Sequence, residues 1–280
     1  MISYIVRGIK RFAVLIPGII IAYFSVHTIF PLVDTRLPVG FAIFVTYVLG
    51  AYVFIPALIR ILRIILPARH LQSYCVTPDG FASDPINIGI VGGKDELIAA
   101  MQAAGWHVAD AYTVQNAMRA VLSVFLNRTY ITAPMSNLYL FGRKHDIGFE
   151  IPVNGVLGHR HHVRFWATSH TQAAKSGFGT VEWHKQRAYT AKEDTVWVGA
   201  ASQDVGYAFI KHTIQVTHMI HADTNAERQF IVDGLRGADF VAEIKSVRLR
   251  RPYRLANRAW RGQLHSDGTL AIITLKRAAS

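Results

Sequence analysis

The pattern of hydrophobic and polar positions divides the chain into an apolar beginning and a longer, mixed remainder. Neither residues 12–33 nor residues 37–59 contain Asp, Glu, Lys or Arg. A helix needs about 20 consecutive apolar residues to cross the hydrocarbon core of a bilayer, and both stretches reach that length. We therefore predict a transmembrane hairpin over residues 1–70, with spans at about 12–33 and 38–62. A linker at 71–83 and a water-facing domain at 84–276 are expected to follow.

The charged residues beside the two spans predict the orientation of this hairpin. The tip between the spans has one acid and one base, Asp34 and Arg36, whereas basic residues flank the outer ends: Arg7, Lys10, Arg11, Arg60, Arg63 and Arg69. Because Lys and Arg near span ends remain on the cytoplasmic side, we expect a two-pass protein of a bacterial inner membrane with both termini in the cytoplasm. The alternatives are a cleaved signal peptide, which normally has a shorter apolar region, and two buried core helices.

The remainder of the chain shows the short periodic segments of a folded domain. The β-branched run Ile86–Val91 is typical of a buried strand, and it ends at Gly92-Gly93. Further strands are expected at 137–141, 146–151, 161–168, 195–202, 214–220, 240–249 and 269–275, and helices at 95–104, 113–126 and 225–235. Because the strands mostly follow one another, we predict an α+β fold, in which a mixed or antiparallel sheet carries a few helices.

Composition and charge favour an anionic partner. The single cysteine, Cys75, excludes an internal disulfide, and the formal net charge is +12. Basic residues without any acid fill the segment 245–261. We expect the following residues to lie at the membrane surface: Arg60, Arg63, Arg69, Lys245, Arg248, Arg250 and Arg251. Membrane lipids are the expected partner, since a cation near an anionic leaflet contributes about 1 kcal/mol. A solvated basic edge is the alternative, and the absence of a recognition motif argues against nucleic acid.

Histidines supply the strongest chemical signal. In the expected strand that contains "HRHHVRFW", His162 and Arg164 share one face while His161 points to the other. A second cluster follows in "THMIHADTNAER". The candidate ligand-binding residues are Arg143, His161, His162, Arg164, His218, His221, Asp223 and Arg228. These residues are compatible with an anion or phosphate site, with a metal or acid–base site, or with structural roles such as a helix-capping box at Thr224–Glu227. Their spacing identifies no metal, cofactor or catalytic set.

At these same segments the chain resembles the LssY C-terminal domain family. The resemblance covers about Asp84 to Leu275 and is carried by the segments "DPINIGIVGGKDELIAAMQAAGWHVAD", "TAPMSNLYLFGRKHDIGFE", "RHHVRFW", "VWVGAASQDVG", "THMIHADTNAER" and "DGTLAIITL". In that family the domain often follows a multi-span phosphatidic-acid phosphatase region, and the resemblance implies no defined reaction. The chain has neither the P-S-G-H segment nor the S-R-x5-H-x3-D segment of such phosphatases, so we do not expect that activity.

Two hypotheses of different class follow. The first is a membrane-anchored binding domain that recognises an anionic lipid headgroup, a phosphorylated ligand or a partner protein through the basic and histidine residues named above. The second is a membrane-associated hydrolase in which His162, His218 or His221 performs acid–base or metal chemistry with Asp223 or Glu227. The sequence favours the first, because it contains no recognisable catalytic motif.

Overall fold

The computed structural model describes residues 19–55, 57–58, 73–78, 82–126, 128–153, 155–169, 195–209, 216–256 and 263–276. Contacts within the chain define two compact units. The N-terminal unit comprises residues 1–68 and 78–81, and the C-terminal unit comprises residues 69–77 and 82–280.

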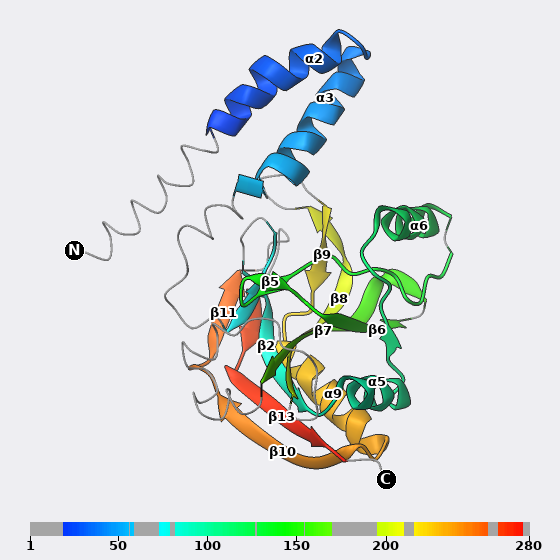
Figure 1. The fold of residues 1–280 in the computed structure, drawn as a ribbon, viewed down its shortest axis with the longest axis vertical. Coiled ribbons are helices and arrows are strands. Elements are labelled where there is room, and N and C mark those ends of the chain that lie inside the picture. Colours follow the sequence, from blue (N-terminus) through cyan, green and yellow to red (C-terminus); the bar gives the residue numbers. More distant parts are fainter. Residues whose placement is uncertain are drawn as a thin grey trace, which may run out of the picture. The chain divides into compact units, whose positions relative to one another are not determined.

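The N-terminal unit contains a helical hairpin (Figure 1). Helical residues 19–24 continue through the π-helical segment η1 (Ser25–Ile29) into α2 (Phe30–Asp34). After a turn, α3 (Val39–Val48) begins next to Pro38 and continues into a second π-helical segment, η2 (Leu49–Phe54). Large apolar side chains of this unit are exposed: Ile19, Ile20, Tyr23, Phe24, Val26, Leu32, Leu37, Val39, Phe41, Ile43, Phe44, Tyr47, Tyr52 and Val53.

The two helical arms fall inside the two predicted membrane spans. In the part of the chain that the structure describes, no helix is both long enough and apolar enough to cross a membrane. The predicted spans also include residues 12–18 and 59–62, which lie outside the described residues. The prediction of a helical hairpin is confirmed, whereas the predicted two-pass topology is not shown.

The C-terminal unit is built on a curled, mainly antiparallel sheet (Figure 1). Its main strands pair in the order β3-β6-β7-β8-β2-β1-β4-β5. Their bounds are β1 (Tyr74–Val76), β2 (Ala82–Val91), β3 (His107–Val108), β4 (Tyr139–Leu140), β5 (Arg143–Lys144), β6 (Ile147–Val153), β7 (Val156–Ser169) and β8 (Thr195–Phe209). β1 lies inside the segment that the sequence predicted as a linker, and it pairs with β2 and β4.

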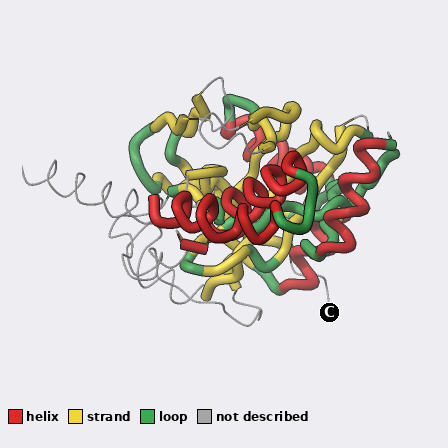
Figure 2. Tube along the Cα trace, turned by 90° about the horizontal axis from the view of Figure 1, so that it is seen from above, coloured by secondary structure: helices red, strands yellow, loops and turns green. Residues whose placement is uncertain are grey.

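Further strands extend this sheet. β9 (Val216–Ile220) pairs with the end of β8, and β13 (Thr269–Leu275) lies parallel to β2. β10 (Val241–Arg248) pairs with β13, while β11 (Tyr253–Ala256) and β12 (Gln263–Ser266) form a separate two-stranded ribbon. Strands account for most of the regular structure in this unit, as the yellow segments of Figure 2 show. The predicted α+β class with a mixed or antiparallel sheet is therefore confirmed.

In the described part of this unit, three helices accompany the sheet: α5 (Lys94–Ala103), α6 (Val114–Phe125) and α9 (Thr224–Gly237). α5 begins directly after β2 because the Glu96 carboxylate accepts a hydrogen bond from the Gly93 amide, at 2.7 Å. This contact satisfies one of the free amides at the helix start. α9 begins at Asp223, whose carboxylate accepts a hydrogen bond from the Asn225 amide. The predicted capping box at Thr224–Glu227 is therefore wrong, since Thr224 and Glu227 bond to His265 and His161 instead.

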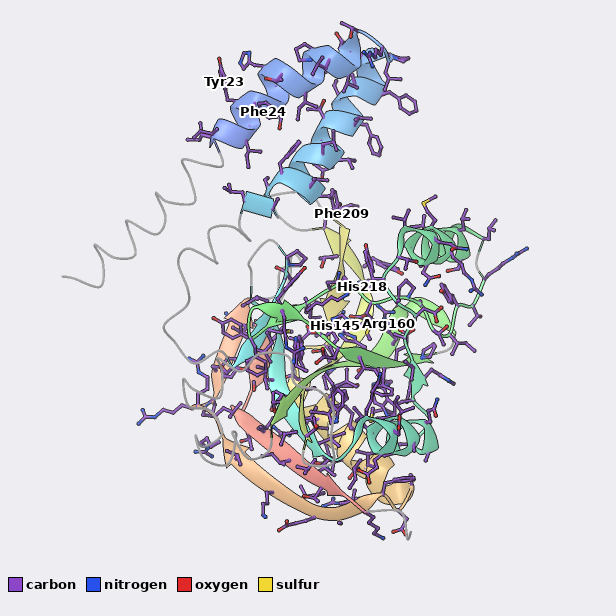
Figure 3. All side chains as sticks on the ribbon, in the orientation of Figure 1. Tyr23, Phe24, His145, Arg160, Phe209 and His218 are labelled. Carbon is purple, nitrogen blue, oxygen red and sulfur yellow. The ribbon has the colours of Figure 1, made fainter. Side chains whose placement is uncertain are left out.

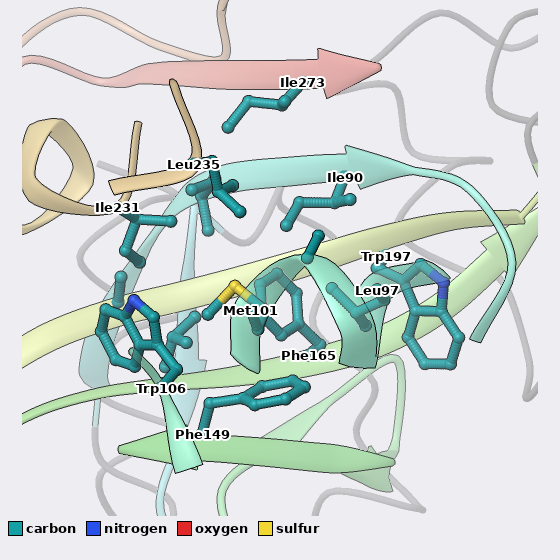
Figure 4. Close-up of a cluster of buried hydrophobic side chains, with 14 of the residues drawn as sticks. Ile90, Leu97, Met101, Trp106, Phe149, Phe165, Trp197, Ile231, Leu235 and Ile273 are labelled. Atoms are coloured by element: carbon teal, nitrogen blue, oxygen red, sulfur yellow. The ribbon is translucent and has the colours of Figure 1, made fainter. Parts of the chain in front are cut away.

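The two faces of the sheet carry separate hydrophobic clusters. On one face, α5 and α9 cover the larger cluster, to which the sheet contributes Phe149, Phe165 and Trp197 (Figure 4). Trp166, the next residue along β7, belongs to the second cluster, together with Ile86 and Leu138. Neighbouring residues of β7 thus enter different clusters, as the alternation of side chains along a strand requires.

Candidate functional site

Strand β7 carries three charged or polar side chains in alternation on one face: Arg160, His162 and Arg164. Each has 4% or less of its surface exposed. In the sheet, β7 lies between β6 and β8. Buried charges are costly unless they are paired, so their partners decide what this face can do.

His162 lies between two carboxylates that come from different strands. Its Nε2 atom is 3.3 Å from Oδ2 of Asp84 on β2. Its Nδ1 atom is 3.5 Å from Oδ2 of Asp204 on β8, and among the described residues Nδ1 has no hydrogen-bond partner. Asp84 and Asp204 are 1% and 2% exposed. The ring therefore bridges two buried acids and retains one unused nitrogen.

Two arginines complete a buried chain of alternating charge. Arg164 Nη1 donates to Asp84 Oδ2 at 3.0 Å, and its Nε donates to the Ser136 carbonyl. Arg160 Nε donates to Asp204 Oδ2 at 3.1 Å, and its Nη1 donates to Glu150 Oε2 at 2.5 Å. The resulting order is Glu150, Arg160, Asp204, His162, Asp84, Arg164.

This network controls the protonation of its acids. Burial acts to raise the pKa of Asp84, but the hydrogen bond and charge of His162 and the charge of Arg164 outweigh it, so the pKa lies below its usual range. Burial also acts to raise the pKa of Asp204, but the neighbouring His and Arg charges outweigh it, so this pKa too lies below its usual range. At Glu150, burial dominates over Arg160 and raises the pKa to about 7. Both aspartates are therefore carboxylates at neutral pH, whereas Glu150 is close to its titration midpoint.

A pocket of about 80 Å³ adjoins the outer part of this network. Its lining residues are Thr77, Ala82, Ser83, Asp84, Ser136, Leu138, His162, Arg164, Asp204, Thr217, His218, Ile220 and Leu264. Glu150 and Arg160 do not line the pocket, and this ion pair forms the inner end of the network. The pocket thus brings together two acids, an arginine and two histidines from four strands, β2, β7, β8 and β9.

His218 enters the pocket from β9, and Figure 3 shows its ring beside this region of the sheet. Its ring lies 4.9 Å from that of Tyr207. Burial lowers the pKa of His218 to about 4, although the Asp204 charge opposes this shift. His218 is consequently a neutral imidazole at physiological pH, which can accept a proton or a hydrogen bond.

The predicted candidates separate into those inside the pocket and those outside. The pocket contains His162, Arg164 and His218. His161 points to the opposite face of β7, where Nδ1 is 2.8 Å from Glu227 Oε2 and the ring stacks on Phe230 at 4.2 Å. His221 and Asp223 are exposed at the start of α9 and do not line the pocket. The two histidine clusters therefore meet in the pocket through His162 and His218, and on the opposite face of β7 through His161 and Glu227.

The remaining candidates, Arg143 and Arg228, are engaged in ion pairs. Arg143 contacts both oxygens of Asp146 at 2.6 Å and donates to the Ala167 carbonyl. Arg228 contacts both oxygens of Asp267 and also donates to the Thr269 carbonyl. Because each guanidinium already has a bidentate carboxylate partner, both arginines are arranged for structural contacts within the domain.

The predicted membrane-surface cations are only partly described. Arg60, Arg63 and Arg69 lie outside the described residues. Arg248, Arg250 and Arg251 are exposed, and Lys245 is exposed beside Glu243 at 2.9 Å. Within the described ranges, no group of three or more His, Cys, Asp or Glu side chains is arranged to hold a metal ion.

Several members of the network were not among the candidates predicted from the sequence: Asp84, Glu150, Arg160 and Asp204. A signal for them exists, because Asp84, Glu150 and Asp204 are each a lone acid within a predominantly apolar strand segment. An acid at such a position is seldom buried without a partner. Ser202 lies opposite His162 in the β7–β8 register, and its buried Oγ has no hydrogen-bond partner among the described residues.

Comparison with known proteins gives one match. No curated protein and no solved structure shows significant similarity to the chain. The family model described as "LssY C-terminus" matches residues 68–270, which include β1 and every residue of the pocket. The resemblance predicted from about Asp84 to Leu275 is thus confirmed over most of its length. The chain belongs to the LssY C-terminal domain family.

Proposed function

We propose that the C-terminal domain binds a small polar ligand with an anionic group in the pocket between Asp84 and His218. The observation that carries this proposal is the convergence of both pocket histidines with Arg164, Asp84 and Asp204 around a shared cavity. A charged network serving stability alone would be expected to close upon itself. Here its outer members line open space instead.

The unused hydrogen-bonding atoms support binding. His162 Nδ1 and Ser202 Oγ are buried and have no hydrogen-bond partner among the described residues. A buried polar atom without a partner costs about 1–3 kcal/mol. Such atoms are best explained when a bound ligand or water satisfies them. Both lie where β7 meets β8, at the registered pair His162 and Ser202.

The charges define the class of ligand. Asp84 and Asp204 are paired with Arg164 and Arg160, and of these two cations Arg164 lines the pocket. An anionic group can bind beside this guanidinium, and hydroxyl or ammonium groups on the same ligand can donate to the two carboxylates. A phosphorylated small molecule or the headgroup of a phospholipid has both properties.

A membrane location fits this ligand class. The exposed apolar side chains of the helical hairpin are what a lipid environment would cover. In this proposal the hairpin is the two-pass anchor in a bacterial inner membrane, with both termini in the cytoplasm. Basic residues such as Arg248, Arg250 and Arg251 would then face anionic headgroups. A protein partner for the domain is the other binding interpretation.

Binding can be tested with phosphorylated probes of increasing size. The full-length protein in detergent is titrated with inorganic phosphate, glycerol phosphate and phosphoethanolamine while thermal unfolding is followed. A ligand that binds only the folded state at 100 times its Kd adds about 2.7 kcal/mol of stability. We expect stabilisation by at least one probe.

Two matched histidine variants make this experiment specific. His162→Gln changes the pocket face of β7, and His161→Gln changes the opposite face of the same strand. We expect His162→Gln to abolish the probe's stabilising effect and His161→Gln to retain it. Equal stabilisation of both variants, or no response of the unmodified protein to any probe, would contradict ligand binding in this pocket.

Hydrolysis is the second candidate function, and neutral His218 is the observation that favours it. His218 lines the pocket, and its pKa of about 4 leaves the imidazole unprotonated at neutral pH, so it is a weak base that can take a proton from an attacking water. In this reaction the water oxygen forms a bond to the electrophilic carbon or phosphorus, His218 accepts the water proton, and the bond to the leaving group breaks, so that nitrophenolate departs with the electron pair. Nitrophenyl acetate and nitrophenyl phosphate serve as probes, and His221→Phe is the control because His221 lies outside the pocket. Turnover that survives His218→Phe would contradict this role.

A further inference from the structure

Helix α6 is amphipathic, and several of its large apolar side chains are exposed. The helix lies at the margin of the C-terminal unit (Figure 1). Val114 is 83% exposed, Met118 56% and Leu122 52%. Residues at spacings of four lie on one side of a helix, so these three form a continuous stripe. The exposed apolar set of this region comprises Tyr112, Val114, Met118, Val121, Leu122, Leu126 and Ile131.

Among the side chains of α6 that the structure describes, those that point inward are small or polar. Asn116, Ala117 and Ala120 are partly buried, and Ser123 is 7% exposed. Asn116 donates to the Ala111 carbonyl, and Ser123 donates to the Ala120 carbonyl. This arrangement is the reverse of that in a typical surface helix, whose apolar stripe packs against the core. The outward stripe therefore needs another explanation.

Charge indicates what covers this stripe. Residues 111–131 contain no Asp or Glu, and their charged side chains are Arg119 and Arg128, both exposed. The Arg119 guanidinium lies 4.4 Å from the centre of the Tyr130 ring, which holds it beside the helix. An apolar stripe with basic and aromatic residues at its margins is typical of a helix that lies in the interface of an anionic bilayer.

We propose that α6 is an interfacial helix that inserts its Val114, Met118 and Leu122 stripe into the headgroup region of an anionic membrane. This inference rests on the proposed membrane association, and it adds the surface by which the domain itself contacts lipid. The exposed apolar hairpin of the same chain favours lipid as the occupant over a second copy of the domain or a different protein. Arg119 and Arg128 supply the complementary charge.

The experiment uses the full-length protein in vesicles of phosphatidylglycerol and phosphatidylethanolamine. An environment-sensitive fluorophore is attached at Leu122→Cys, with Gln229→Cys on the exposed side of α9 as the matched control. Cys75 is fully buried, so labelling of the unmodified chain measures the background. We expect a blue shift for the Leu122 label and several-fold stronger quenching by acyl-chain quenchers than for the Gln229 label.

The outcomes separate this inference from the proposed membrane association. If the protein floats with vesicles and the Leu122 label is no better quenched than the control, the role of α6 is wrong while membrane association stands. A blue shift without quenching by lipid would indicate contact with protein and would also overturn the inference. Failure of the protein to float with vesicles would refute both. Loss of quenching in vesicles of phosphatidylcholine alone would support the role assigned to the two arginines.

Discussion

The two faces of strand β7 are equally well buried, yet they achieve burial by opposite means. On one face Val163 and Phe165 are fully buried among apolar side chains below α5 and α9. On the other face His162 and Arg164 are 2% and 4% exposed and depend on Asp84 for their charge balance. Apolar burial stabilises roughly in proportion to area and needs no specific partner. Buried charge stabilises only while every partner is present, so the polar face is the more vulnerable of the two.

The largest expected effect comes from removing Asp84. Asp84→Ala leaves Arg164 buried without its carboxylate, and breaking a buried ion pair costs about 3–5 kcal/mol. We expect a loss of that size in the free energy of unfolding of the domain. Urea titration of the full-length protein, followed by the fluorescence of buried Trp106, Trp166 and Trp197, measures it.

A double-mutant cycle shows whether the loss comes from the unpaired charge. Arg164→Met removes the cation, so Asp84→Ala combined with Arg164→Met should recover a large part of the stability that Asp84→Ala loses. Strictly additive losses would mean that the two residues are independent. The charged face would then resemble the apolar face, and the contrast drawn between them would fail.

The contrast also explains how far the sequence predicted this molecule. Alternation along β7 placed His162 and Arg164 together and His161 opposite them, because side-chain direction is a local property of a strand. The runs of β-branched residues likewise predicted β2, and the order of the segments predicted the α+β class. These features depend on neighbours in sequence.

The partners of the network could not be predicted in the same way. Asp84, His162 and Asp204 come from three strands, and their meeting depends on the pairing order of the sheet. The sequence also does not reveal that Arg143 and Arg228 are used by Asp146 and Asp267. Pairing across the fold thus decided which predicted cations line the pocket. The partial burial of His218 on β9, which pairs with β8, is a further consequence of that pairing order.

The second-largest expected effect is a pH dependence of the free energy of unfolding that arises from His218, and its test leaves the apolar core unchanged. Since the pKa of His218 is about 4 in the folded domain and about 6.5 in an unfolded chain, the unfolded state binds more protons between these values. His218 therefore destabilises the fold as pH falls through 6.5 toward 4. We expect the free energy of unfolding of His218→Gln, relative to that of the unmodified protein, to rise by about 2 kcal/mol when the pH is lowered from 8 to 5.

Comparison with a variant is needed because other groups titrate in the same range. Glu150, with its pKa raised to about 7, contributes stability at low pH that is lost as pH rises toward 7, which opposes the effect of His218. Urea midpoints of both proteins at pH 5, 6, 7 and 8 give the difference directly. A difference that does not change with pH would show that His218 is not held neutral by burial.

The smallest expected effect tests the apolar face. Val163→Ala removes buried methyl groups from the cluster below α5 and α9, and area removed from water predicts a loss of about 1.5 kcal/mol. This loss should be the same at pH 5 and pH 8, because no titratable group is removed, and stabilisation by a phosphorylated probe should be unchanged. Val163 lies between His162 and Arg164 in sequence but on the opposite face, so it is the closest available control for the pocket residues. If Val163→Ala abolished the stabilising effect of the probe, a substitution on either face of β7 would be enough to disturb the pocket. Loss of the probe's effect in His162→Gln would then no longer be evidence that the His162 ring contacts the ligand.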